Sequence, residues 1–140
     1  MIQVFSGRKL VGALLTISAL TMAGSSAKAQ AASATAGGYG NQYMAVYSVV
    51  PTVTVVLPAN SSDMVVTIEV VDSTGAAVGG QETFYSNAGG TFTGHARNIA
   101  RPPIGGAVYT VNVVTCHYLA NKQPVIIIIP GTSCNITVQP

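Results

Sequence analysis

Two cysteines, Cys116 and Cys134, are the residues of this 140-residue chain with the widest choice of chemistry. An oxidising compartment joins two such cysteines, whereas metal and redox sites favour a CxxC spacing that this sequence lacks. Two-residue alternation places Cys134 on the same inward side as Ile136 and Val138. We therefore expect a Cys116 to Cys134 disulfide that closes a loop of about 18 residues and stabilises the fold by roughly 3 kcal/mol. A metal-binding pair or a reactive thiol is the alternative.

The two histidines, His95 and His117, are the candidate acid–base or metal-binding groups. His117 directly follows Cys116, but adjacent residues of a strand point to opposite faces, which does not suit a cysteine–histidine nucleophile. His95 shares the polar side of its strand with Thr93 and Arg97, as is typical of a surface histidine. No carboxylate stands at a ligand spacing from either histidine, so we predict no metal site and no cofactor.

The four carboxylates do not form a catalytic set. Asp63, Glu69 and Asp72 lie before, within and after one expected strand, where turn and solvent-facing roles account for them; the fourth is Glu82. The sequence contains no GxSxG or HExxH motif and no phosphate-binding glycine loop, and its glycine pairs separate strands. We predict no catalytic residue and a protein that is not an enzyme.

A candidate contact surface comprises Tyr43, Tyr47, His95 and Arg97. The two tyrosines are an even number of positions apart, so on one strand they share a face. Exposed, they offer a contact surface; buried, they belong to the core, and the sequence leaves both open. Two matches to the N-glycosylation pattern, at Asn60 and Asn135, are equally open because their use depends on the host.

The N-terminal residues have the pattern of a secretory signal. Arg8 and Lys9 precede an apolar run over 10–22, which is shorter than the roughly 20 residues that span a bilayer. Ala27 and Ala29 supply a small-x-small cleavage pattern, so we predict a signal peptide over 1–29 and a mature chain from Gln30. A retained helix is the alternative. The protein is expected to be secreted, on the cell surface or periplasmic, in a bacterial host.

The charge of the mature chain argues against some partners. Removing the signal leaves three basic residues against four acidic residues, which gives no electrostatic footprint for nucleic acid. No membrane span is predicted in the mature chain. Near-zero net charge together with many β-branched residues favours self-association.

The remaining pattern predicts strands. An Ala/Ser/Gly-rich lead over 30–41 is expected to be flexible. Beyond it, apolar β-branched runs alternate with Gly, Pro, Asn and Ser, and the alternation of Met64, Val66, Ile68 and Val70 is the clearest. The run 125–129 suggests burial on both faces. Strands are expected at 43–50, 52–57, 64–71, 82–85, 91–97, 107–116, 125–129 and 134–138.

This pattern predicts a single β-sandwich over 42–140, immunoglobulin-like or a related Greek key, with a small β-barrel as the alternative. We expect a structural or adhesive component of a cell-surface or secreted assembly, self-associating or binding a protein through a sheet edge. The alternative is a periplasmic or extracellular binding module, chaperone-like or an inhibitor, that recognises a protein or glycan.

Overall fold

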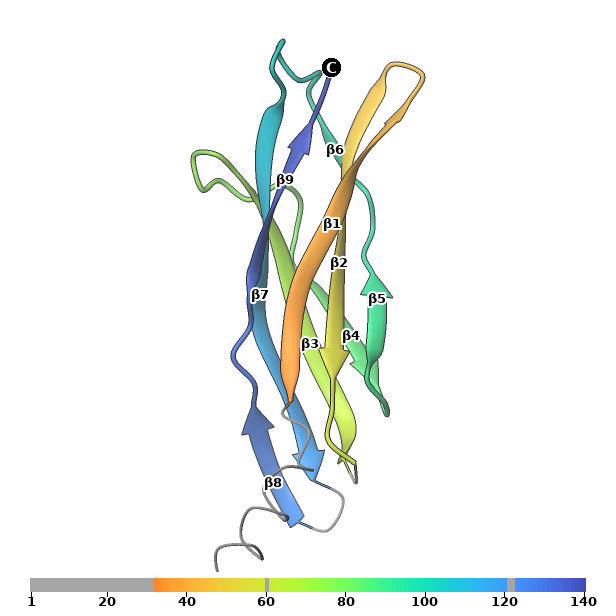
Figure 1. Ribbon diagram of the computed structural model, residues 1–140, viewed down its shortest axis with the longest axis vertical. Coiled ribbons are helices and arrows are strands. Elements are labelled where there is room, and N and C mark those ends of the chain that lie inside the picture. The colour runs from red at the N-terminus through yellow and green to blue at the C-terminus, as the bar shows by residue number, and fades with distance from the viewer. Residues whose placement is uncertain (1–31, 60, 121–122) are drawn as a thin grey trace, which may run out of the picture. The chain divides into compact units, whose positions relative to one another are not determined.

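The computed structural model describes residues 32–59, 61–120 and 123–140, so the predicted signal at 1–29 and the Asn60 sequon lie outside the described residues. Two antiparallel sheets pack against each other, and the described chain contains no helix (Figure 1). The predicted all-β, two-sheet architecture is confirmed. The strands are β1 (Ser33–Tyr43), β2 (Val46–Val56), β3 (Ser61–Asp72), β4 (Glu82–Ser86), β5 (Gly90–Thr93), β6 (Arg97–Ile99), β7 (Ala107–Ala120), β8 (Gln123–Ile128) and β9 (Ser133–Val138).

Sheet A is built around β2. On one side β2 pairs with the whole of β1, and on the other it pairs with β5 and β6 in succession. The predicted continuous strand over 91–97 is wrong, since residues 94–96 are irregular between β5 and β6. The Gly94 amide donates to the Pro51 carbonyl at 2.8 Å within this break. Pro51 has no amide hydrogen to donate to a neighbouring strand, but its carbonyl accepts this hydrogen bond from Gly94.

Sheet B is built around β3 and β7, in the order β4-β3-β7, with β8 and β9 sharing the remaining side of β7. Strand β9 pairs with the first half of β7 and β8 pairs with its last residues. The register between β3 and β7 shifts between Thr67 and Ile68, where Val114 is the extra residue of a bulge.

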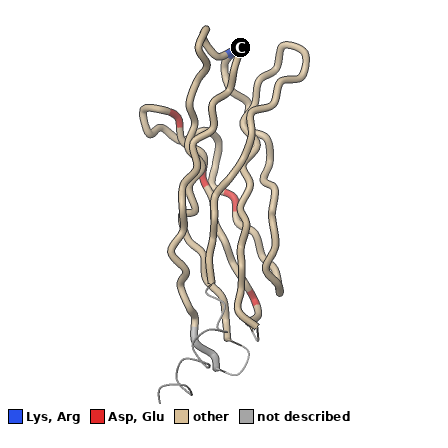
Figure 2. Tube along the Cα trace, in the orientation of Figure 1, with Lys and Arg blue, Asp and Glu red and all other residues tan. Residues whose placement is uncertain are grey.

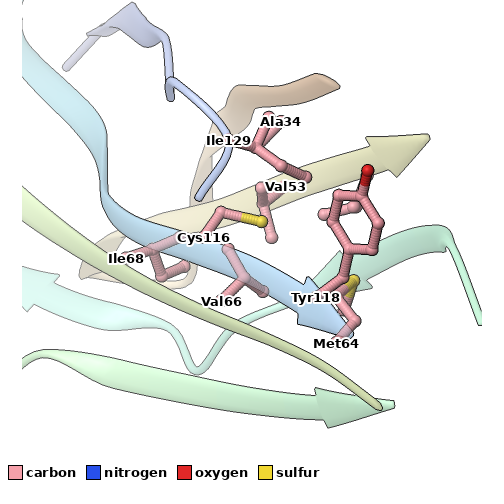
Figure 3. Close-up of a cluster of buried hydrophobic side chains, with 9 residues drawn as sticks. Ala34, Val53, Met64, Val66, Ile68, Cys116, Tyr118 and Ile129 are labelled. Carbon is pink, nitrogen blue, oxygen red and sulfur yellow. The ribbon is translucent and has the colours of Figure 1, made fainter. Parts of the chain in front are cut away.

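The core between the sheets consists of two clusters. One contains Met64, Val66, Ile68 and Cys116, and Figure 3 shows these side chains converging with others from both sheets. The other contains Val70 and residues of β1, β2, β7 and β9. The predicted inward alternation of β3 is confirmed, because all four of its alternate apolar residues are buried.

The prediction of a flexible lead over 30–41 is wrong from Ser33 onward, because this segment forms most of β1. Its small residues have a packing role. A Cβ on Gly38 would lie 2.5 Å from Ile136 Cδ1, and a Cβ on Gly40 would lie 2.9 Å from Val138 Cγ2. The glycines therefore let β1 approach β9 closely, which closes that side of the sandwich.

Backbone contacts fasten the start of β1 to the segment between β8 and β9. The Thr132 amide donates to the Ala34 carbonyl at 3.2 Å, and the Ala36 amide donates to Thr132 Oγ1 at 2.9 Å. Ala34 and Ala36 are both buried. The alternating small side chains therefore allow this segment to pack as a strand, although its residues have low strand propensity.

Candidate interaction surface

The predicted disulfide between Cys116 and Cys134 is wrong in this structure, since both thiols are free. Cys134 pairs with Val111, which lies five residues before Cys116 on β7. At about 3.4 Å per residue the two cysteines are separated by roughly 17 Å along the strand, and a disulfide requires Cα atoms within about 7 Å. Cys116 lies in one core cluster and Cys134 packs against the other.

Cys116 and His117 lie on opposite faces of β7, as predicted. Cys116 is buried in the core, whereas His117 pairs across the sheet with Val65 and Ile128, whose side chains are on the outer face. Burial raises the pKa of the Cys116 thiol, because the thiolate would lose its hydration. The arrangement opposes the formation of a nucleophilic thiolate at this position.

A polar cluster links the two sheets at the side of the sandwich away from β1. Glu82 on β4 accepts a hydrogen bond from the His95 amide at 2.9 Å, and its other oxygen lies 2.5 Å from His95 Nδ1. Arg97 on β6 donates from Nη2 to Glu82 at 3.2 Å and to the Gly80 carbonyl at 3.0 Å. Glu82 is not identifiable as a partner from the sequence, because the three residues come from different strands and loops.

The electrostatics of this cluster favour a structural role. Partial burial opposes the charge of Glu82, but the hydrogen bonds from His95 and the charge of Arg97 outweigh burial and lower the pKa of Glu82. The Arg97 side chain is only 11% exposed, against 87% for His95. The prediction that Arg97 belongs to a contact surface is therefore wrong, whereas His95 is accessible.

Tyr43 and Tyr47 do not share a face. Residues 44–45 form a turn in which Met44 has a φ of 55°, so Tyr43 ends β1 and Tyr47 lies on β2. Tyr47 is buried, with its hydroxyl accepting a hydrogen bond from Gln42 Nε2 at 3.1 Å. Tyr43 is 71% exposed at the tip of the hairpin. The predicted strand over 43–50 is wrong because a two-residue turn interrupts it.

A row of three large apolar side chains and one histidine crosses the outer face of sheet B from edge to edge. The register places Tyr85 of β4 beside Val65 of β3, Val65 beside His117 of β7, and His117 beside Ile128 of β8. The two ends of this outer row are the most exposed, with Tyr85 at 77% and Ile128 at 76%. Ile126, which is 62% exposed, extends the outer row along β8.

The prediction that residues 125–129 are buried on both faces is wrong for three of them, since Ile126, Ile127 and Ile128 are all exposed. Ile126 and Ile128 point to the exposed outer face, and among the described side chains of this run it is Ile129 that is buried in the core. Strand β8 lies at the edge of sheet B, with no layer of the described chain over its outer face. From the sequence, the continuous β-branched run predicts an interior strand. In the structure, the same run forms part of the surface.

A carboxylate, Asp63, borders the outer row on one side, and the neighbouring row on the other side is uncharged. The neighbouring row is a threonine ladder, in which Thr67 Oγ1 and Thr83 Oγ1 are 2.9 Å apart and Thr115 lies beside Thr67. Glu69 lies beyond the threonine ladder, and Figure 2 shows how sparsely charged residues occur along the described chain. A hollow of about 270 Å³ adjoins Tyr85, lined also by Asp63, Met64, Val65 and Ser86.

Other classes of site receive no support from the described residues. No three His, Cys, Asp or Glu side chains in the described ranges gather closely enough to hold a metal ion. Nor does any helix in this part of the chain have the length and apolar character to cross a membrane. Comparison of the sequence with protein-family models, and of the chain with curated proteins and solved structures, finds no match.

Proposed function

We propose that this chain is an exported, non-enzymatic β-sandwich of immunoglobulin-like type that acts by contact, as a structural or adhesive component of a cell-surface or secreted assembly. The outer row of Tyr85, Val65, His117 and Ile128 is the observation on which the proposal depends. A large exposed apolar side chain is ordinary when it is isolated, but a contiguous, mostly apolar set on one sheet face is typical of a protein interface.

The composition supports assembly. Protein interfaces lose charged residues and gain aromatic and large apolar ones at their centre, and the outer row has that character. The signal pattern of residues 1–29 supports export, and the proposed assembly would form in the compartment to which the chain is exported. Glu82 of β4 links the two sheets through His95 and Arg97, so these polar side chains are engaged within the sandwich and do not belong to the outer row.

Light scattering coupled to size-exclusion chromatography tests this proposal on the protein as recovered from the expressing host. Ordered multimers that weaken on the substitution Tyr85→Lys support it. Tyr43→Lys is the matched control, because Tyr43 is 71% exposed and lies on the hairpin of sheet A, away from the outer row. A wild-type protein that is strictly monomeric at every concentration overturns assembly from this chain's own copies.

A second hollow favours the binding-module alternative. It has a volume of about 290 Å³ between the ends of β1 and β9 and is lined by Gly40, Asn41, Gln42, Thr137, Val138 and Gln139. Amide side chains both donate and accept hydrogen bonds, which suits a neutral polyhydroxylated ligand such as a glycan. Calorimetric titration with neutral oligosaccharides, compared with Asn41→Ala, tests this function.

A further inference from the structure

The edges of the two sheets are protected to different degrees. Strand β4 has five residues, and its Glu82 pairs with the buried Ile68 and is only 14% exposed, an inward charge placement that opposes addition of another strand. Strands β5 and β6 have only four and three residues. The side chains of β9 pack against β1, through Gly38 and Gly40. Of the described edges, β8 is the one on which these protections are weakest.

The exposed edge of β8 is formed by the backbone of Ile126 and Ile128. The Ile129 amide donates to the Cys116 carbonyl at 2.8 Å, so Ile129 faces β7. Hydrogen-bonding direction alternates along an antiparallel strand, so Ile127 also faces β7, while the amides and carbonyls of Ile126 and Ile128 point away from it.

Prolines delimit this edge. Pro130 occupies the position of the next outward-facing amide after Ile128, and on the other side the register between β7 and β8 shifts before Ile126, next to Pro124; neither proline has an amide hydrogen. An added strand can therefore both donate hydrogen bonds to β8 and accept them from it only along residues 126–128. This three-residue segment limits an added strand to a few main-chain hydrogen bonds, which opposes the addition of further strands one after another.

We propose that the occupant of this edge is the same edge of a second copy, paired antiparallel about a two-fold axis near Ile127. This inference rests on the proposed function and names its partner. Ile126 pairs with Ile128 of the partner subunit, and the symmetric pair forms on the other side of the axis, giving about four main-chain hydrogen bonds.

Charge and shape favour a second copy. A two-fold contact places each residue opposite an equivalent surface, so any charge near the axis would meet a like charge. The sequence of β8, QPVIII, has no charged residue. Pairing also joins the outer rows of the two copies side by side, because Ile126 and Ile128 lie on the same outer face. Three paired residues bury far less than the roughly 800 Å² per partner of a standard interface, so the dimer should depend on concentration.

Sedimentation velocity over a hundredfold range of concentration, with wild type and Ile126→Pro, tests this inference. Ile126→Pro removes an outward-facing amide and leaves the β7 ladder intact, so dimerisation should fall at least tenfold. Ile126→Thr is the matched control, since it keeps the amide and the β-branched shape and should retain most of the dimer. Equal circular dichroism spectra establish that the variants are folded.

Amide hydrogen exchange of the wild type gives an independent measurement if Ile126→Pro does not fold. At low concentration Ile127 and Ile129 should be protected and Ile126 and Ile128 should exchange rapidly; at high concentration the latter pair should slow. Self-association without this slowing, or association unchanged in Ile126→Pro, overturns the β8 pairing and leaves the proposed function standing. A strictly monomeric wild type overturns both the β8 pairing and assembly from this chain's own copies.

Discussion

Arg97 donates to Glu82 at 3.2 Å across the side of the sandwich where no main-chain ladder joins the two sheets in the described structure. The pair lies largely out of solvent, with the Arg97 and Glu82 side chains 11% and 14% exposed. Arg97 Nε is buried and has no hydrogen-bond partner among the described residues. Glu82 is therefore the principal compensation for a guanidinium charge held near the core edge.

Replacing Glu82 with Gln is expected to destabilise the fold by about 1–3 kcal/mol, since the buried Arg97 charge would lose its counter-charge. Equilibrium unfolding in urea at pH 7 measures the change. Asp63→Asn is the control, because Asp63 is exposed and its side chain accepts a hydrogen bond from Ser62 Oγ at 3.3 Å; the change in unfolding free energy should stay within about 0.5 kcal/mol. Equal effects of the two substitutions would contradict the role of Glu82.

The same cluster predicts how stability depends on pH. Glu82 has a folded pKa below its ordinary value of 4.5, so its contribution is present above that value and is lost as the pH falls through the folded pKa. Urea unfolding of wild type and Glu82→Gln at a series of pH values measures this. The difference between the two proteins should be constant near neutrality and shrink below about pH 4.5. A difference that grows on acidification would be inconsistent with a lowered pKa.

Local alternation was sufficient to predict part of the fold. Met64, Val66, Ile68 and Val70 occupy every second position, so their common burial follows from strand geometry alone. The turn at residues 44–45 could not be anticipated in the same way. Met and Ala lack the conformational preferences of Gly or Asn, and the positive φ of Met44 is imposed by the pairing of β1 with β2.

The candidate site depended on contacts between distant segments. The link between Glu82 and Arg97 requires knowing that β4 and β6 belong to different sheets on the same side of the sandwich. The exposure of Ile128 likewise depends on β8 being an edge strand, which its composition contradicts. Sequence patterns indicate which residues favour burial, whereas the pairing of strands determines which of those residues are buried.

Gly38 is expected to be intolerant of a side chain. A Cβ would lie 2.5 Å from Ile136 Cδ1 and 2.7 Å from the Val50 carbonyl oxygen, and the φ of +153° is unfavourable for an L residue. Gly38→Ala should therefore destabilise by about 1–3 kcal/mol. Gly80→Ala provides the control because no heavy atom lies within 4 Å of its Cβ position. Thermal unfolding followed by circular dichroism compares them, and similar midpoints would contradict close packing of β1 on β9.

The separation of the cysteines predicts a thiol content for the folded protein. Titration with a thiol-reactive dye should find two free thiols after unfolding, and in the native state Cys134 should react first because Cys116 is buried. The raised pKa of Cys116 slows its reaction further, since the thiolate is the reacting species. Cys134→Ser identifies the faster phase. An intact mass lower by two hydrogen atoms, with no titratable thiol, would instead show that β7 and β9 adopt a different register from Cys134 beside Val111.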